Sequence, residues 1–152
     1  MPEAAGAPAG RTLSFLAFDF GTRRVGVASG NTLLQRATPL KTLSVDGEAR
    51  FVAIAKLLAE WDPDALVVGV PFHPDGAEHE NTLKARRFAR QLHGRFRLPV
   101  HQVDERYSTT EAHALLGAGR RGAAPAGRDI DAVSAALILE QFLDSTSMPS
   151  AG

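Results

Sequence analysis

The sequence predicts an α/β fold in which a mixed five-stranded sheet is flanked by helices. Three strand-type segments follow one another near the N-terminus, which predicts antiparallel neighbours. Helix-type and strand-type segments then alternate, and this alternation adds parallel strands to a sheet. The 152 residues, 44% of them hydrophobic, suffice for one domain with its own core. We therefore expect three antiparallel strands followed by two parallel ones.

The three leading strands are predicted at residues 14–20, 23–29 and 34–43. Gly21-Thr22 separates the first two, so they are expected to form a hairpin. Pro39 lacks an amide hydrogen, which places the third strand at an edge of the sheet.

The later elements are separated by residues that end helices and strands. Asp62-Pro63 ends the first helix and Gly94 is expected to end the second. The short apolar segment between two prolines, residues 65–70, is typical of a strand buried on both faces. The sequence thus predicts helices at 47–61, 81–93, 108–116 and 128–143, and strands at 65–70 and 98–104.

The two ends and the composition limit the classes of function. Residues 1–12 and 145–152 are rich in small residues, proline and glycine and are expected to be disordered, which leaves a single domain at 13–144. Seventeen basic residues balance seventeen acidic ones, so no global attraction to nucleic acid or membrane is expected. Cysteine is absent, which excludes disulfides, thiolate zinc sites and cysteine nucleophiles. No segment has the length or the flanks of a membrane span or a signal peptide, so a cytoplasmic protein is expected.

Asp19 interrupts the apolar first strand, where a carboxylate loses hydration. It could bond locally to the following Gly-Thr turn, as Asp often does. Alternatively, it is a metal ligand at the end of a central strand.

Acidic residues also follow the last strand and begin the last helix. Asp104 and Glu105 are adjacent, so at most one faces Asp19, and strand alternation leaves open which one. Glu111 is a weaker candidate because it has capping-box spacing. Asp129 is expected to cap the last helix. Asp131 is expected to lie on the largely apolar stripe of that helix that faces the protein interior. That stripe contains Ser134, Ala135, Ile138 and Phe142.

Three converging carboxylates would repel one another unless a cation were present. Oxygen ligands suit Mg²⁺ or Mn²⁺, and two such ions about 3.5–4 Å apart can activate water for attack on a phosphodiester. The five histidines lack the spacing of a zinc site.

Basic residues are concentrated in two places. Residues 84–106 contain seven basic residues and only two acidic ones. Within this segment, Arg86, Arg90 and His93 have the spacing of one helix face. The glycine-rich loop 117–127 carries two arginines suited to clamping phosphates. The candidate nucleic-acid contacts are Arg23, Arg86, Arg90, Arg106, Arg120 and Arg121.

Residues 17–28, AFDFGTRRVGVA, resemble the opening motif of the YqgF family. The resemblance covers residues 14–144 in order and with compatible spacing. Its further motifs are VGVP at 68–71, DG at 75–76, ARRFA at 85–89, VDERYSTTEA at 103–112 and IDAVSAA at 130–136.

The resemblance implies a ribonuclease-H-like fold and a metal-dependent nuclease that processes the 5′ end of precursor 16S ribosomal RNA. It implies that Asp19, Glu105 and Asp131 are the catalytic residues and hold Mg²⁺ or Mn²⁺. Tyr107 stands where family members often have Leu, a difference that could alter substrate contacts but removes no ligand. The implied partner is RNA or structured DNA, the implied state is a monomer or homodimer, and no membrane is involved.

Three other functions are considered. The family was earlier regarded as a resolvase of four-way (Holliday) DNA junctions, which requires a dimer for symmetric cutting. A nucleic-acid-binding module without catalysis could keep the same carboxylates for folding. Residues 19–22, DFGT, are also similar to the phosphate loop of sugar and acetate kinases, but this chain is too short for their second domain.

Overall fold

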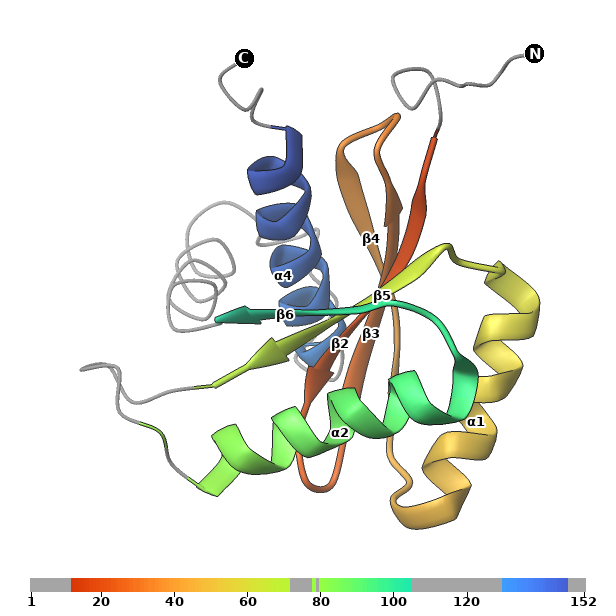
Figure 1. The fold of residues 1–152 in the computed structure, drawn as a ribbon, viewed down its shortest axis with the longest axis vertical. Helices are drawn as coiled ribbons and strands as arrows, with labels where there is room; N and C mark the ends of the chain where they lie inside the picture. Colours follow the sequence, from red (N-terminus) through yellow and green to blue (C-terminus); the bar gives the residue numbers. More distant parts are fainter. Residues whose placement is uncertain (1–11, 72–77, 79, 105–129, 148–152) are drawn as a thin grey trace.

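Five strands form one twisted sheet in the order β4-β3-β2-β5-β6 (Figure 1). This computed structural model describes residues 12–71, 78, 80–104 and 130–147. Its elements are β2 (Ser14–Phe20), β3 (Val25–Asn31), β4 (Arg36–Leu43), α1 (Gly47–Trp61), β5 (Ala65–Val70), α2 (Glu80–Phe96), β6 (Val100–Asp104) and α4 (Ile130–Ser147).

The pairing of the strands confirms the predicted topology. β2 and β4 both run antiparallel to β3, and β5 and β6 are the two parallel additions. β2 lies at the centre, which places Asp19 in the middle of the sheet. β4 lies at an edge, as Pro39 predicts, and Pro39 pairs with Ala28 where the register of the ladder shifts.

The helices differ from their predicted bounds chiefly at the C-terminal ends of α2 and α4. α2 passes through Gly94 and runs to Phe96, so the prediction that Gly94 ends it is wrong. The left-handed residue that closes this helix is Arg97, with φ of 60°, and its amide donates to the carbonyl of His93 at 2.9 Å. α4 extends to Ser147, beyond the predicted start of the disordered tail at residue 145. The predicted helix at 108–116 lies outside the described residues. None of the helices in the described ranges is both long and apolar enough to cross a membrane.

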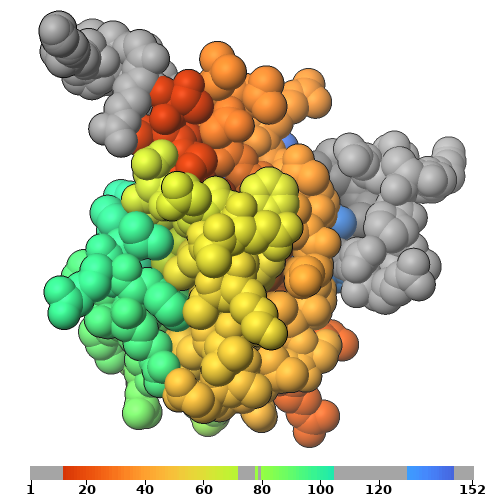
Figure 2. Space-filling model, turned by 90° about the vertical axis from the view of Figure 1, so that its right-hand side faces the viewer, coloured from red at the N-terminus to blue at the C-terminus, as the bar shows by residue number. Residues whose placement is uncertain are grey.

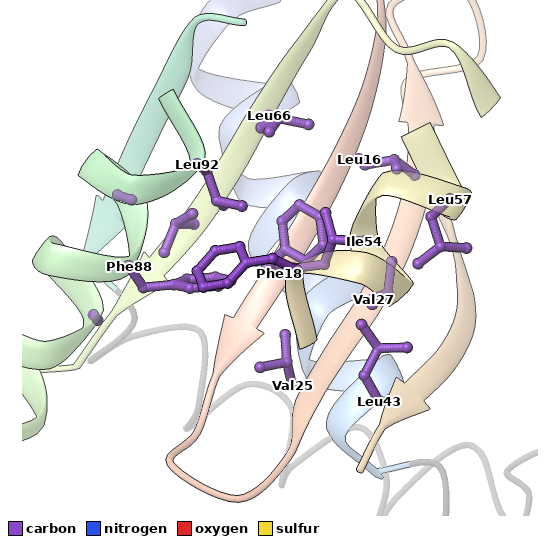
Figure 3. Packing of buried hydrophobic residues seen from close by; sticks show 14 of the residues in the cluster. Leu16, Phe18, Val25, Val27, Leu43, Ile54, Leu57, Leu66, Phe88 and Leu92 are labelled. Carbon is purple, nitrogen blue, oxygen red and sulfur yellow. The ribbon is translucent and has the colours of Figure 1, made fainter. Parts of the chain in front are cut away.

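Alternate residues of β2 enter two separate cores, one on each side of the sheet. Leu16 and Phe18 join the cluster beneath α1 and α2, where the rings of Phe18 and Phe88 meet edge to face at 6.0 Å (Figure 3). Phe15 and Ala17 join a second cluster with side chains of α4. The sheet therefore separates an α1/α2 side from an α4 side, and each strand residue can be assigned to one of them.

One arginine joins α1 to α2 on the α1/α2 side. Figure 2 shows the outer surface of α1 between β4 and the segment that forms the end of α2 and β6. Arg95 of α2 donates two hydrogen bonds to Glu48 of α1, at 3.0 and 2.9 Å, and lies 4.0 Å from the ring centre of Phe51. The hydrogen-bonded guanidinium lowers the pKa of Glu48 below its usual value.

Candidate carboxylate site

Asp19 faces the α4 side of the sheet, because it shares the alternation of Phe15 and Ala17. It is partly buried. Its partners in register are Gly26 of β3 and Gly69 of β5. Both lateral neighbours therefore lack side chains, which lets other groups approach the Asp19 carboxylate across the sheet surface.

The first turn of α4 packs directly on Gly26. A Cβ atom at Gly26 would lie 1.9 Å from the carbonyl oxygen of Asp131 and 2.8 Å from the amide nitrogen of Ala132. Only glycine permits this approach, because no side chain could occupy that space. Since Gly26 is also the register partner of Asp19, the two predicted aspartates adjoin the same strand residue.

Asp131 forms an ion pair with Arg24, the residue that precedes β3. The guanidinium Nε lies 2.9 Å from Oδ2 of Asp131. The arginine side chain is 64% exposed and the aspartate side chain 26% exposed. Ala135 and Ile138, on the stripe predicted for Asp131, are buried, and so are Ala132 and Ala136 on the neighbouring stripe. Asp129, the predicted cap, lies outside the described residues.

The turn that carries Arg24 is held from the other side of the sheet by Arg50 of α1. Arg50 is only 5% exposed, its Nε donates to the carbonyl of Val45 at 2.9 Å, and its Nη2 donates to the carbonyl of Thr22 at 3.1 Å. Burial lowers the pKa of this guanidinium from its usual value. A Cβ at Gly21 would lie 2.5 Å from the Arg24 carbonyl oxygen, so the turn is tight as well as anchored.

Replacing Arg50 with Met is expected to lower the free energy of unfolding by about 2–4 kcal/mol, because it removes two hydrogen bonds from a charged donor and leaves the carbonyls of Val45 and Thr22 without it. Urea denaturation measures the loss. Arg87→Met is the matched control, since Arg87 is exposed on α2 and its loss is expected to change stability by less than about 0.5 kcal/mol. Equal effects of the two substitutions would contradict an anchoring role for Arg50.

Asp104 faces away from Asp19. It pairs with Val70, which lies in the α1/α2 core, whereas the preceding residue, Val103, packs against the α4-side cluster. Glu105, the other candidate from this pair, lies outside the described residues. Among the residues that the structure describes, no group of three or more His, Asp or Glu could hold a metal ion. The structure therefore places the main chain of Asp131 against Gly26, the register partner of Asp19, and Glu105 stays a prediction.

The predicted basic residues lie in two regions. Arg23 is exposed in the turn between β2 and β3, next to Arg24. Arg86 is engaged by an ion pair with Glu78, whereas Arg90 is exposed and borders a groove of about 550 Å³ between α2 and β6. The groove is lined by Ala89, Arg90, His93, Pro99, Val100 and Gln102. It lies on the α1/α2 side, opposite Asp19. Arg106, Arg120 and Arg121 lie outside the described ranges.

Sequence reasoning missed three residues that shape this site. Gly26 had a usable signal, because a glycine within a strand pattern often marks a close backbone approach. Arg50 had one too, since it lies four residues before the buried Ile54 on the same helix face. Arg24 had none, because nothing in the sequence separates it from its neighbour Arg23.

Comparison with known proteins gives one family. The family model described as "RuvX: Holliday junction resolvase" matches residues 13–145. Three similar curated proteins are each named "Putative pre-16S rRNA nuclease". The one from Albidiferax ferrireducens is 64% identical over 87% of this chain and 78% of its own length. The one from a Polaromonas species is 60% identical over 87% and 88%, and that from Paraburkholderia phytofirmans is 56% identical over 92% and 94%.

Among solved structures, RuvC of T. thermophilus in complex with a Holliday junction substrate is similar with a TM-score of 0.52 and 16% sequence identity. The match covers 90% of this chain and 96% of that chain. A second structure of RuvC from Thermus thermophilus is similar with a TM-score of 0.50 and 15% sequence identity, over 89% of this chain and 96% of that chain. At such low identity these likenesses concern the fold, and they confirm the predicted ribonuclease-H-like architecture.

Proposed function

Because the chain belongs to the RuvX family, also called YqgF, we propose that it is a nuclease that hydrolyses phosphodiester bonds of precursor 16S ribosomal RNA. The names of relatives at 64% and 60% identity support this substrate. The observation that carries the proposal is that the first turn of α4, at Asp131, packs on Gly26, the residue of β3 that pairs with Asp19 of β2. A ribosomal RNA substrate also implies a cytoplasmic site of action.

We propose that Asp19 and Asp131 hold Mg²⁺ or Mn²⁺. Both offer hard oxygen donors, and both adjoin glycine rather than a bulky side chain, so the donor set fits such an ion. The chemistry that such ions supply when bound is activation of a water molecule and stabilisation of the leaving oxygen. The contribution of the chain is to fix the two carboxylates. Asp131 also lies in the first turn of α4, where the helix dipole favours a negative charge.

We propose Glu105 as the third ligand. Asp104, the other acid of the pair Asp104-Glu105, is excluded because its side chain lies on the α1/α2 side of the sheet. By strand alternation, a residue that continued β6 past Asp104 would share the side of Val103, which is the α4 side. This argument agrees with the ligand set that the family resemblance implies.

For substrate binding we propose two contacts. Arg23, at the turn beside the carboxylates, suits a phosphate near the cleaved bond. Arg90 and the groove between α2 and β6 suit a more distant part of the RNA. Arg86 contributes less, because Glu78 already neutralises it. Arg106, Arg120 and Arg121 are kept as proposed contacts on sequence grounds.

Arg90→Gln is expected to weaken binding of single-stranded RNA about threefold and to reduce the salt dependence of binding by about one phosphate contact. Fluorescence anisotropy at several salt concentrations measures both quantities. Arg36→Gln is the control, because Arg36 is an exposed arginine on β4, at the opposite edge of the sheet. Equal losses for the two variants would show that only net charge matters.

The test of the proposed function compares two substrates. The protein is incubated with precursor 16S ribosomal RNA and with a four-way DNA junction, each with Mn²⁺ and with chelator. We expect metal-dependent cleavage of the RNA. Cleavage of the junction alone would support the resolvase, which the family description favours and which requires a dimer. Binding of RNA with no cleavage and no Mn²⁺ binding would support a non-catalytic module.

A further inference from the structure

The ion pair between Arg24 and Asp131 brings a guanidinium into contact with one of the proposed metal ligands. We propose that Arg24 is a positioning residue: it is the counter-ion of Asp131 while the site lacks a divalent cation, and a bound cation displaces it. This inference rests on the proposed function only in requiring that the site accept a divalent cation.

The exposure of the two partners decides which of them moves. Asp131 is 26% exposed, and its main chain is fixed where α4 touches Gly26. Arg24 is 64% exposed, and its Nε lies 2.9 Å from Oδ2 of Asp131. A long exposed side chain turns into solvent at low cost, and such surface ion pairs are weak. The exchange therefore consists of a rotation of Arg24 with no movement of the carboxylate.

The backbone around Arg24 makes this exchange local. Its carbonyl oxygen packs against Gly21, and the carbonyl of Thr22 accepts a hydrogen bond from the buried Arg50. The turn is thus held in place while the side chain of Arg24 is exposed. When the pair breaks, the guanidinium stays near the site, because its Cα atom is anchored.

The same pair affects the affinity for metal. A divalent cation that binds Asp131 must replace a guanidinium already in contact with the carboxylate. The displaced guanidinium stays nearby, and its positive charge repels the cation. Arg24 therefore makes cation binding weaker than the carboxylates alone would allow. In its absence, the same ligands should bind the cation more tightly.

The experiment is a calorimetric titration of the full-length protein with Mn²⁺. Arg24→Gln is expected to bind Mn²⁺ about two- to fivefold more tightly than the wild type, the range set by the worth of an exposed ion pair. Arg24→Lys keeps the charge and is expected to lie between them. Arg36→Gln removes the same charge from β4, where Arg36 is exposed and pairs with Asn31 at the other end of β3, and is expected to leave the affinity unchanged within about twofold.

Thermal unfolding gives a second measurement. In chelator, Arg24→Gln is expected to unfold about 1–2 °C below the wild type, and saturating Mn²⁺ should raise its midpoint more than that of the wild type. A gain in affinity with a loss of metal-free stability is not the result of a general structural defect, which would weaken both.

The possible failures are distinguishable. If the wild type binds Mn²⁺ and Arg24→Gln binds it equally or more weakly, the role of Arg24 is overturned while the proposed nuclease stands. If the wild type binds no Mn²⁺, the metal dependence of the proposed function fails and this inference fails with it.

Discussion

Gly26→Ala is expected to lose about 3 kcal/mol of stability and at least about a hundredfold in the rate of RNA cleavage. The added Cβ would lie 1.9 Å from the carbonyl oxygen of Asp131, and a backbone oxygen cannot rotate away as a side chain can. The first turn of α4 must therefore move away from β3. Asp131 moves with it, away from the strand residue that pairs with Asp19.

Urea denaturation, Mn²⁺ titration and a cleavage assay together measure these effects. Gly94→Ala is the matched control, because Gly94 lies within α2 with nothing within 4 Å of an added Cβ. There the same substitution is expected to stabilise the protein by about 0.5–1 kcal/mol, from helix propensity alone. A Gly26→Ala protein that stays as stable and active as the wild type would show that α4 is not fixed by this contact.

Asp19→Asn is expected to slow cleavage of precursor RNA by at least about a hundredfold, because a metal site contributes several kcal/mol to such a reaction and asparagine lacks the charge that holds the cation. The substitution keeps the size of the side chain. The unfolding midpoint in chelator is therefore expected to stay within about 2 °C of the wild type. Cleavage kinetics and Mn²⁺ titration measure the two losses.

The acids at the end of β6 provide the controls for this prediction. Asp104→Asn is expected to leave the cleavage rate within about threefold of the wild type, because its side chain belongs to the α1/α2 side. Glu105→Gln is expected to behave like Asp19→Asn. An Asp19→Asn protein that cuts at the wild-type rate would contradict the proposed mechanism. A large loss for Asp104→Asn but not for Glu105→Gln would show that Asp104, and not Glu105, is the third ligand.

The fold followed from the sequence because its signals are local. β2, β5 and α1 have the predicted bounds, since apolar strand segments and the Asp62-Pro63 stop depend on neighbouring residues. The prediction that Gly94 ends α2 was wrong because a glycine by itself does not end a helix. The geometry that closes α2 is adopted by Arg97, and an exposed glycine within a helix is tolerated at modest cost.

The site was only partly predictable, because it depends on contacts between distant segments. Helical spacing predicts Asp131 rather than Asp129 as the inward acid, and this choice stays a prediction because Asp129 lies outside the described residues. Alternation alone could not orient Asp104, since that requires knowing which side of the sheet each residue of β5 faces. The pairing of Arg24 with Asp131 likewise depends on where α4 crosses β3, which no local pattern encodes.

The groove beside Arg90 and the carboxylate of Asp19 are on opposite sides of one sheet, and β6 forms the border nearest the groove. A polynucleotide that reaches both must bend sharply over that border. Unpaired RNA can follow such a path. A double helix cannot, because it is stiff: the persistence length of double-stranded DNA is about 150 base pairs. If both proposed contacts bind one polynucleotide, frayed or unpaired ends are the expected substrates, and the expected result is a footprint on one continuous flexible stretch.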